Sequence, residues 1–533
     1  MKKLLMIGLD GATYALLKPL IADGYMPFLG KVMAEGAYGE LMSTPNPLTP
    51  PGWISTVTGC SPDVHGIYDF LRPESTEAGV FLKVNDSRDI LCDTVWTLAS
   101  RQGKRVTTLN FYGMSPPVEV DGYLISGFIP WRHLRSATFP ESLFDTVKSL
   151  PNVDIKKLGM DIGEEKKCIQ GLPEEEYEDW IHLQSERDAA WTELLSHLME
   201  HDPTDLTAIV YDGTDKIQHL FWRYLDPSLV EETTAIPWDT HIRELCLNSY
   251  RQIDQSIERL VAISGPDTHL VITSDHGFGP THEVVYVNEW LARNGYLSWT
   301  AQTIVDNTSK LTADRIKDHT LMIDWEHTLA YSLTPSSNAI YVKQAKDGTQ
   351  GVSPEEYPDF CRTLQQKLLD YRHPIDGGQV FAKADLNENR LAGKPSLEHA
   401  PDITLGLRDG GFVSILRSAE VVKTRDKVDG THRPNGVFIA WGPDIASGKH
   451  LEPLSILDVT PMLLHLMGLE IPKEIEGRVP VEALKAEALS ANPVKISEMV
   501  QPAKPKAAAD RPEISEDEKD ALMAQLKLLG YMD

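Results

Sequence analysis

Three short apolar runs in the sequence each end in an acidic or small polar residue. The runs and the residues that follow them are 4–9 with Asp10, 206–211 with Asp212, and 269–273 with Ser274 and Asp275. Near-continuous apolar runs of this length are typical of strands buried on both faces of a parallel sheet. Helical patterns lie between them, so we predict an α/β fold with a mostly parallel central sheet and helices on both faces. The polar residues then lie at the carboxyl edge of the sheet, where open α/β folds bind ligands.

The alternation of strand and helix patterns is interrupted over residues 287–399, where charged residues are frequent and the segments are short. We predict that 287–399 is an inserted cap on a discontinuous core formed by residues 1–286 and 400–485. The loss of periodicity and the Pro- and Ala-rich stretches that follow indicate a linker over 486–514. A last amphipathic helix is expected within 515–533, docked on the protein's own core.

The charge balance restricts the possible partners. The chain has 51 lysines and arginines against 78 aspartates and glutamates, a formal net charge of -27. Such a chain repels polyanions at long range, so a surface for duplex nucleic acid is not expected. A small anionic substrate would need concentrated local positive charge, which bound divalent cations can supply.

Cysteine usage and hydropathy indicate a compartment. The five cysteines are widely separated and form no paired CxxC motif, so neither a disulfide framework nor a thiolate zinc site is predicted, and a cytoplasmic protein is expected. The apolar run near the start of the chain stops at Asp10 without a cleavage site, so we interpret it as a strand rather than a signal peptide. No segment approaches the roughly 20 consecutive apolar residues of a membrane-spanning helix. Neither the cysteine usage nor the hydropathy pattern indicates an oligomeric state.

Two pairs of acidic and histidine side chains have spacings that suit metal ligands. In Asp215-Lys-Ile-Gln-His219 the two side chains are four residues apart, so a helix would project them from one face. Alone, such a pair is more often a surface contact. Asp275 and His276 directly follow a predicted strand and precede Gly277, which permits a tight turn. A turn capped by Asp275 would explain the Asp and the Gly but would leave His276 without a role.

Three further residues are candidates for the same site. Asp10 ends a predicted strand and precedes a glycine, although a helix N-cap alone would explain it. His432 is expected in a loop just before the apolar run 436–441. Thr49 opens the segment Thr-Pro-Pro-Gly-Trp, which is typical of a loop entering a helix, and a helix amino terminus favours an anion. A threonine hydroxyl there could attack phosphorus if a metal ion held it as an alkoxide.

Together these motifs resemble the alkaline phosphatase superfamily and, more closely, its type I phosphodiesterase/nucleotide pyrophosphatase branch. The resemblance spans about residues 3–479. It rests on Gly8-Leu-Asp-Gly11, the segment from Thr49 to Gly59, Ser61-Pro-Asp-Val-His-Gly-Ile67, the Asp215/His219 pair, Ser274-Asp-His-Gly277 and His432. It implies an alkaline-phosphatase-like core and an enzyme that hydrolyses phosphoric esters.

The resemblance also implies how the ligands divide between two divalent metal ions. One ion would be held by Asp215, His219 and His432, and the other by Asp10, Asp275 and His276, with Thr49 bridging toward the phosphorus. Zinc is the expected metal, although manganese and cobalt accept the same oxygen and imidazole ligands. The two ions would balance three carboxylates and a threonine alkoxide, which favours a diester monoanion over a monoester dianion.

The substrate is less constrained than the reaction centre. Thr49 and Trp53 stand where a sulfatase has a Cys or Ser and, four residues later, an Arg, so sulfatase chemistry is disfavoured. Phe70 occupies the position of an asparagine that holds a phosphate oxygen in nucleotide pyrophosphatases, which leaves nucleotide specificity open. We predict Phe70 and Asn110 as substrate-binding residues, and Asn110 or the Thr49 backbone N–H could donate to the phosphate instead.

We therefore predict a phosphodiesterase/nucleotide pyrophosphatase-like hydrolase that acts on a small phosphate ester through a phosphothreonine intermediate. The alternatives are a phosphomonoesterase or phosphonate hydrolase of the same superfamily, a phosphoryl-alcohol transferase, and a non-catalytic metal-binding homologue. The cap over 287–399 is expected to select the leaving group.

Overall fold

The computed structural model describes residues 3–76, 79–160, 172–233, 236–301, 322–334, 336–345, 350–394, 397 and 399–498. The helix predicted within 515–533 and the predicted linker residues from 499 onward lie outside these residues. The described part of the predicted linker contains helix α18 (Ala486–Ala491) and strand β21 (Ile496–Ser497). Strand β21 pairs with β20 (Ile471–Pro472), so residues 486–498 are tied to the core by backbone pairing.

A ten-stranded sheet forms the centre of the larger lobe, in the order β18-β2-β17-β9-β1-β8-β5-β6-β7, with β19 paired to β2. The three predicted strands are β1 (Leu4–Leu9), β8 (Leu206–Tyr211) and β9 (His269–Thr273), and they are parallel neighbours. The predicted α/β fold with a mostly parallel sheet is confirmed. The other strands are β2 (Ala37–Met42), β5 (Val106–Phe111), β6 (Gly122–Ser126), β7 (Thr138–Phe139), β17 (Asn435–Trp441), β18 (Lys449–His450) and β19 (Leu454–Ser455).

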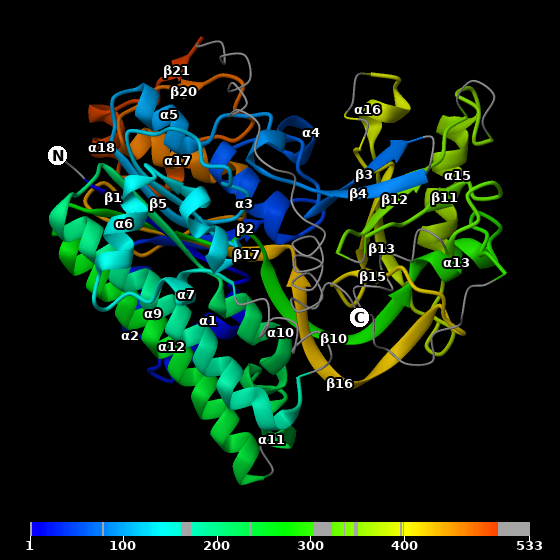
Figure 1. Ribbon diagram of the computed structural model, residues 1–533, viewed down its shortest axis with the longest axis horizontal. Helices are drawn as coiled ribbons and strands as arrows, with labels where there is room; N and C mark the ends of the chain where they lie inside the picture. Colours follow the sequence, from blue (N-terminus) through cyan, green and yellow to red (C-terminus); the bar gives the residue numbers. More distant parts are fainter. Residues whose placement is uncertain are drawn as a thin grey trace.

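Helices cover both faces of this sheet, because successive side chains of each strand point to opposite sides. Leu5 and Ile7 of β1 belong to one apolar cluster, Leu4 and Met6 to the other. The first cluster includes α1 (Tyr14–Ala22), α2 (Pro27–Glu35), α9 (Tyr177–His201) and α12 (Pro237–Ser264), and the second α3 (Thr49–Thr58), α5 (Val95–Arg101) and α17 (Val459–Leu466). The long α9 and α12 run side by side along the outside of the lobe (Figure 1). None of the helices in the described residues could span a membrane.

Two long antiparallel strands, β10 (Gly277–Tyr286) and β16 (Val422–Arg433), lead from the larger lobe into a second lobe (Figure 1). This second lobe has a four-stranded sheet, β11-β12-β14-β13, and a hydrophobic cluster of its own. Its elements are α13 (Val287–Arg293), β11 (Ala330–Tyr331), β12 (Ala339–Val342), α15 (Tyr357–Asp370), β13 (Phe381–Leu386), α16 (Glu388–Leu391), β14 (Ile403–Leu407) and β15 (Val413–Ser414).

The second lobe extends further along the chain than the predicted cap of 287–399. Strand β14, predicted as part of the resumed core, pairs with β12 and β13 inside the second lobe. The hydrophobic cluster of the second lobe also includes Val413, Val421 and Val422. The chain returns to the central sheet only at β17, which pairs with β9 and β2.

Candidate metal centre

The carboxyl ends of β1, β8 and β9 meet at one edge of the sheet, and the predicted ligands gather there. The register aligns Gly8 of β1 with Val210 of β8 and with Thr273 of β9, so the residues that follow these strands lie at one level. Helix α10 (Gly213–Leu225) starts just after β8 and carries two more of the predicted ligands. The seven predicted residues are all buried, none more than 4% exposed: Asp10, Thr49, Asp215, His219, Asp275, His276 and His432.

Asp215, His219 and His432 form one group of converging ligand atoms. The Asp215 Oδ1 atom lies 3.2 Å from His432 Nε2 and 3.5 Å from His219 Nε2, and the two histidine nitrogens are 3.0 Å apart. Tetrahedral zinc with bonds of about 2.0–2.1 Å places its ligand atoms about 3.3 Å from one another. The three atoms therefore have the separations of a tetrahedral cation site. Asp215 and His219 share a face because they are one turn apart on α10.

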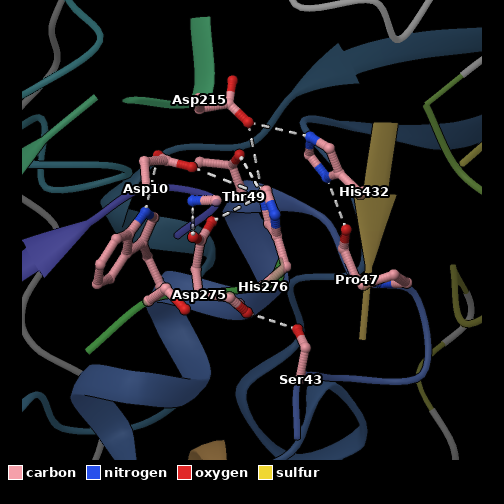
Figure 2. Close-up of polar contacts among 12 residues, drawn as sticks. Asp10, Ser43, Pro47, Thr49, Asp215, Asp275, His276 and His432 are labelled. Atoms are coloured by element: carbon pink, nitrogen blue, oxygen red, sulfur yellow. Dashed lines mark hydrogen bonds and ion pairs between the residues drawn. The ribbon is translucent and has the colours of Figure 1, made fainter. Parts of the chain in front are cut away.

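Asp10, Asp275 and His276 form a second group beside the first (Figure 2). The His276 Nε2 atom lies 3.2 Å from Asp275 Oδ2, 3.6 Å from Asp10 Oδ1 and 3.4 Å from Thr49 Oγ1. It also lies 4.0 Å from Asp215 Oδ1. His276 thus stands between the two groups, and Thr49 reaches the same nitrogen.

The pKa values and hydrogen bonds of the three carboxyl groups suit a bound cation. Burial raises the pKa of Asp10 and of Asp275 well above the ordinary value, and neighbouring carboxylates raise both further. Burial also opposes ionisation of Asp215, but the nearby His219 and His432 lower its pKa overall. One buried oxygen of each carboxylate accepts no hydrogen bond from any N–H or hydroxyl group in the described residues: Asp10 Oδ1, Asp215 Oδ1 and Asp275 Oδ2. Oxygens of this kind suit divalent metal ions, so the residues present fit such a group.

The imidazoles are in the form that binds metals. Burial lowers the pKa of His276 well below its usual range, and lowers the pKa of His432 to about 4. Both rings are therefore neutral at physiological pH, with a lone pair on one nitrogen. The Nδ1 atom of His432 lies 2.8 Å from the backbone oxygen of Pro47, and that of His276 lies 3.1 Å from the oxygen of Gly277. A proton on each Nδ1 leaves Nε2 directed into the cluster.

Several supporting contacts were not predicted. The Trp53 Nε1–H group donates to Asp10 Oδ2 at 3.0 Å, and the Gly11 N–H group donates to Asp275 Oδ1 at 3.2 Å. Trp53 lies four residues after Thr49, on the same face of α3. In the sequence, this spacing was the only indication that Trp53 lies near the site. The Ser43 hydroxyl donates to the backbone oxygen of Asp275 at 2.5 Å (Figure 2).

The segment that begins with Thr49 forms helix α3, with prolines in its first turn and Gly59 in the left-handed conformation at its end (φ 68°). Thr49 is the first residue of this helix, where backbone N–H groups favour an anion. Gly52 packs on the backbone of Asp275: a Cβ atom there would lie 2.8 Å from Asp275 Cβ and 2.9 Å from its oxygen. The small residue thus permits the close approach of α3 to Asp275.

Three details differ from, or qualify, the predictions. His432 lies in strand β16 and not in a loop. Phe70 is fully buried and packs edge-on against Tyr112, with ring centroids 5.2 Å apart. Asn110 is also buried, and its Nδ2 atom donates to the Val210 oxygen at 2.9 Å and to Asp212 Oδ1 at 3.2 Å. A role for Phe70 or Asn110 in substrate binding stays a prediction.

The chain is similar to one known protein family and to solved structures. The family model described as type I phosphodiesterase / nucleotide pyrophosphatase matches residues 4–434. A search of curated proteins finds no match. Among solved structures, phosphonoacetate hydrolase from Sinorhizobium meliloti 1021 in complex with phosphonoformate has a TM-score of 0.50 at 14% sequence identity, over 86% of this chain and 94% of that chain. An inactive variant of murine ectonucleotide pyrophosphatase / phosphodiesterase 5 in complex with AMP has a TM-score of 0.48 at 15% identity, over 88% of this chain and 96% of that chain.

Proposed function

Because the chain belongs to the type I phosphodiesterase / nucleotide pyrophosphatase family, whose members hydrolyse phosphoric esters, we propose that it hydrolyses phosphodiesters with Thr49 as the nucleophile. The observation that carries this proposal is the buried cluster at the edge of the sheet. Three carboxylates and three imidazoles converge there, and the Thr49 hydroxyl lies 3.4 Å from His276 Nε2.

The donor set fits two divalent metal ions, with zinc as the proposed metal. Asp215, His219 and His432 would hold one ion, and Asp10, Asp275 and His276 the other. Bound there, the ions would lower the pKa of the threonine hydroxyl and neutralise negative charge on the phosphate oxygens. The hydrogen bonds that hold Asp10, His276 and His432 keep the ligands oriented before substrate arrives.

The reaction of this chain's own residues has two halves. Thr49 Oγ forms a bond to phosphorus as the bond from phosphorus to one alcohol oxygen breaks, and that alcohol leaves with a proton. Water then attacks the phosphothreonine, which releases Thr49 and a phosphate monoester. The amino terminus of α3 stabilises negative charge on the phosphoryl oxygens in both halves.

The charge of the cluster favours diesters. Two divalent cations balance three carboxylates and a threonine alkoxide, so the centre has no surplus positive charge for a monoester dianion. A diester monoanion requires less positive charge from the centre. We therefore propose a diesterase and not a monoesterase.

The test is metal reconstitution followed by parallel assays of bis(4-nitrophenyl) phosphate and 4-nitrophenyl phosphate. We expect activity only with divalent metal, a higher kcat/KM on the diester, and a loss of at least about a thousandfold in Thr49→Ala. The matched control is Thr146→Ala, which removes an exposed threonine from helix α6 (Ser142–Ser149). A higher kcat/KM on the monoester, or full activity in Thr49→Ala, would overturn the proposal.

A further inference from the structure

A cavity of about 160 Å³ lies between the larger lobe and the second lobe. Its wall on the larger lobe comes from residues 44–46, Pro51 and the loop and short helix that follow α3. Its wall on the second lobe comes from β12, β13 and β14. The polar residues used below are Thr44, Asn46 and Asp63 on the first wall, and Ser337, Asp385 and Thr404 on the second.

Asn46 is an unsatisfied polar group in this cavity. The residue is only 9% exposed, its amide atoms Oδ1 and Nδ2 are fully buried, and neither has a hydrogen-bond partner among the described residues. Buried amides in native proteins are almost always hydrogen-bonded. The backbone around Asn46 is held in place, because its oxygen accepts from Thr44 Oγ1 at 2.6 Å and from Leu48 N at 2.8 Å. The unpaired amide is thus enclosed on a fixed loop at the wall of the cavity, where rotation of the side chain would offer it to a ligand.

The same loop is part of the reaction centre. Ser43, just before the cavity wall, donates to the backbone oxygen of Asp275, and the oxygen of Pro47, just after it, lies 2.8 Å from His432 Nδ1 (Figure 2). Asn46 is three residues before Thr49, so their Cα atoms are at most about 11 Å apart. A group bound beside Asn46 is thus within reach of a phosphate at Thr49.

The composition of the cavity restricts what can bind. Among the described residues that line it, none is a Lys, Arg or His, whereas Asp63 and Asp385 are carboxylates. A second phosphate would be repelled, which disfavours a pyrophosphate or a nucleoside polyphosphate. The volume is below the roughly 300 Å³ at which pockets for drug-sized ligands begin. Hydroxyl, amide and carboxylate groups on both walls match a ligand with several hydroxyl groups.

We propose that this cavity binds a small uncharged polyhydroxy alcohol, one of the two alcohols esterified in the substrate, and that Asn46 recognises its hydroxyl groups. This inference rests on the proposed function, because it places the alcohol beside a phosphate at Thr49. Asn46 provides one acceptor and two donors, and Thr404 on β14 provides a hydroxyl from the opposite wall. The second lobe would in this way select the substrate without taking part in the chemistry.

The experiment compares two diesters with the same leaving group, 4-nitrophenyl glyceryl phosphate and 4-nitrophenyl ethyl phosphate. The wild-type enzyme is expected to prefer the glyceryl ester by at least about tenfold in kcat/KM, because buried polar groups discriminate strongly for a hydroxyl partner. Asn46→Ala is expected to reduce this preference to less than about twofold, mainly through KM of the glyceryl ester. The isosteric Thr404→Val is expected to reduce it as well, from the other wall.

The control is Asn152→Ala, which removes an exposed asparagine from a turn and should leave the preference unchanged. Equal kcat/KM for the two esters in the wild type, or an unchanged preference in both Asn46→Ala and Thr404→Val, would overturn the inference while leaving the proposed function in place. Hydrolysis of neither ester by the metal-loaded enzyme would contradict the proposed function and, with it, the inference.

Discussion

The hydrogen bond from Trp53 to Asp10 gives the sharpest test of how the candidate metal centre is held together. Trp53 is fully buried, and its Nε1 atom lies 3.0 Å from Asp10 Oδ2. Replacing Trp53 by Phe keeps an aromatic ring on α3 but removes the only N–H group of that side chain. Asp10 Oδ2 then loses its donor at a site that water reaches poorly.

The size of the effect follows from that contact. A hydrogen bond to a charged group contributes about 1.5–3 kcal/mol, and about 1.4 kcal/mol corresponds to a factor of ten. We therefore expect Trp53→Phe to bind divalent metal about 10–100 times more weakly, which is the range typical of lost contacts behind a metal ligand. The assay is a titration of the metal-free protein with Zn²⁺ in competition with a chromophoric chelator.

Trp96→Phe is the matched control. Trp96 is also fully buried, and both indoles contact the ring of Phe111, with centroid distances of 4.8 Å for Trp96 and 5.6 Å for Trp53. The Trp96 Nε1–H group has no hydrogen-bond partner within the described parts of the chain. Both substitutions remove the same ring volume, so both should lower the free energy of unfolding. Equal metal affinities of the two variants would refute the assignment of Trp53 as a support of Asp10.

Three further predictions concern stability. Burial raises the pKa of Asp69 to about 6, although the hydroxyls of Thr334 and Ser336 lower it in part. The stability that comes from the neutral carboxyl is therefore present at low pH and is lost as the pH rises through 6. Relative to Asp69→Asn, the wild type should therefore lose about 2 kcal/mol of unfolding free energy between about pH 4 and about pH 7, measured by urea unfolding; a constant difference would contradict this. Gly52→Ala should lower the free energy of unfolding by about 1–3 kcal/mol and lower activity, because the new Cβ atom would lie 2.8 Å from Asp275 Cβ. A variant with wild-type stability and activity would show that helix α3 can shift to make room. Removal of metal by a chelator should lower Tm, and metal at about 100 times its Kd should restore about 2.7 kcal/mol; an unchanged Tm would argue against buried metal ions.

Much of the core and of the site could be predicted from the sequence, because the signals are local. Strands β1, β8 and β9 are mostly apolar and are buried along their whole length, and each has the predicted bounds. Each is followed by a polar residue, and parallel neighbouring strands place such residues at one edge whatever the length of the connection. This is why Asp10 and Asp275 could be expected near each other although they are far apart in the chain.

The remaining features depend on tertiary contacts that leave no periodic pattern. Strand β14 is short and only partly buried, so its place in the second lobe follows from pairing with β12 and β13 rather than from its own residues. Trp53 is a large aromatic residue of the kind that packs in protein cores. Its hydrogen bond to Asp10 depends on how α3 lies against β1. Asn46 has no sequence signal at all, because its importance comes from the wall that the second lobe builds opposite it.

The central claim is that Thr49 attacks phosphorus, and the most direct measurement is mass spectrometry of the enzyme quenched during turnover of a slow diester. We predict a phosphoryl group, with its retained alcohol, on the peptide that contains Thr49, and no such adduct in Thr49→Ala or in the metal-free protein. Turnover without any adduct on that peptide, together with an active Thr49→Ala enzyme, would contradict the account.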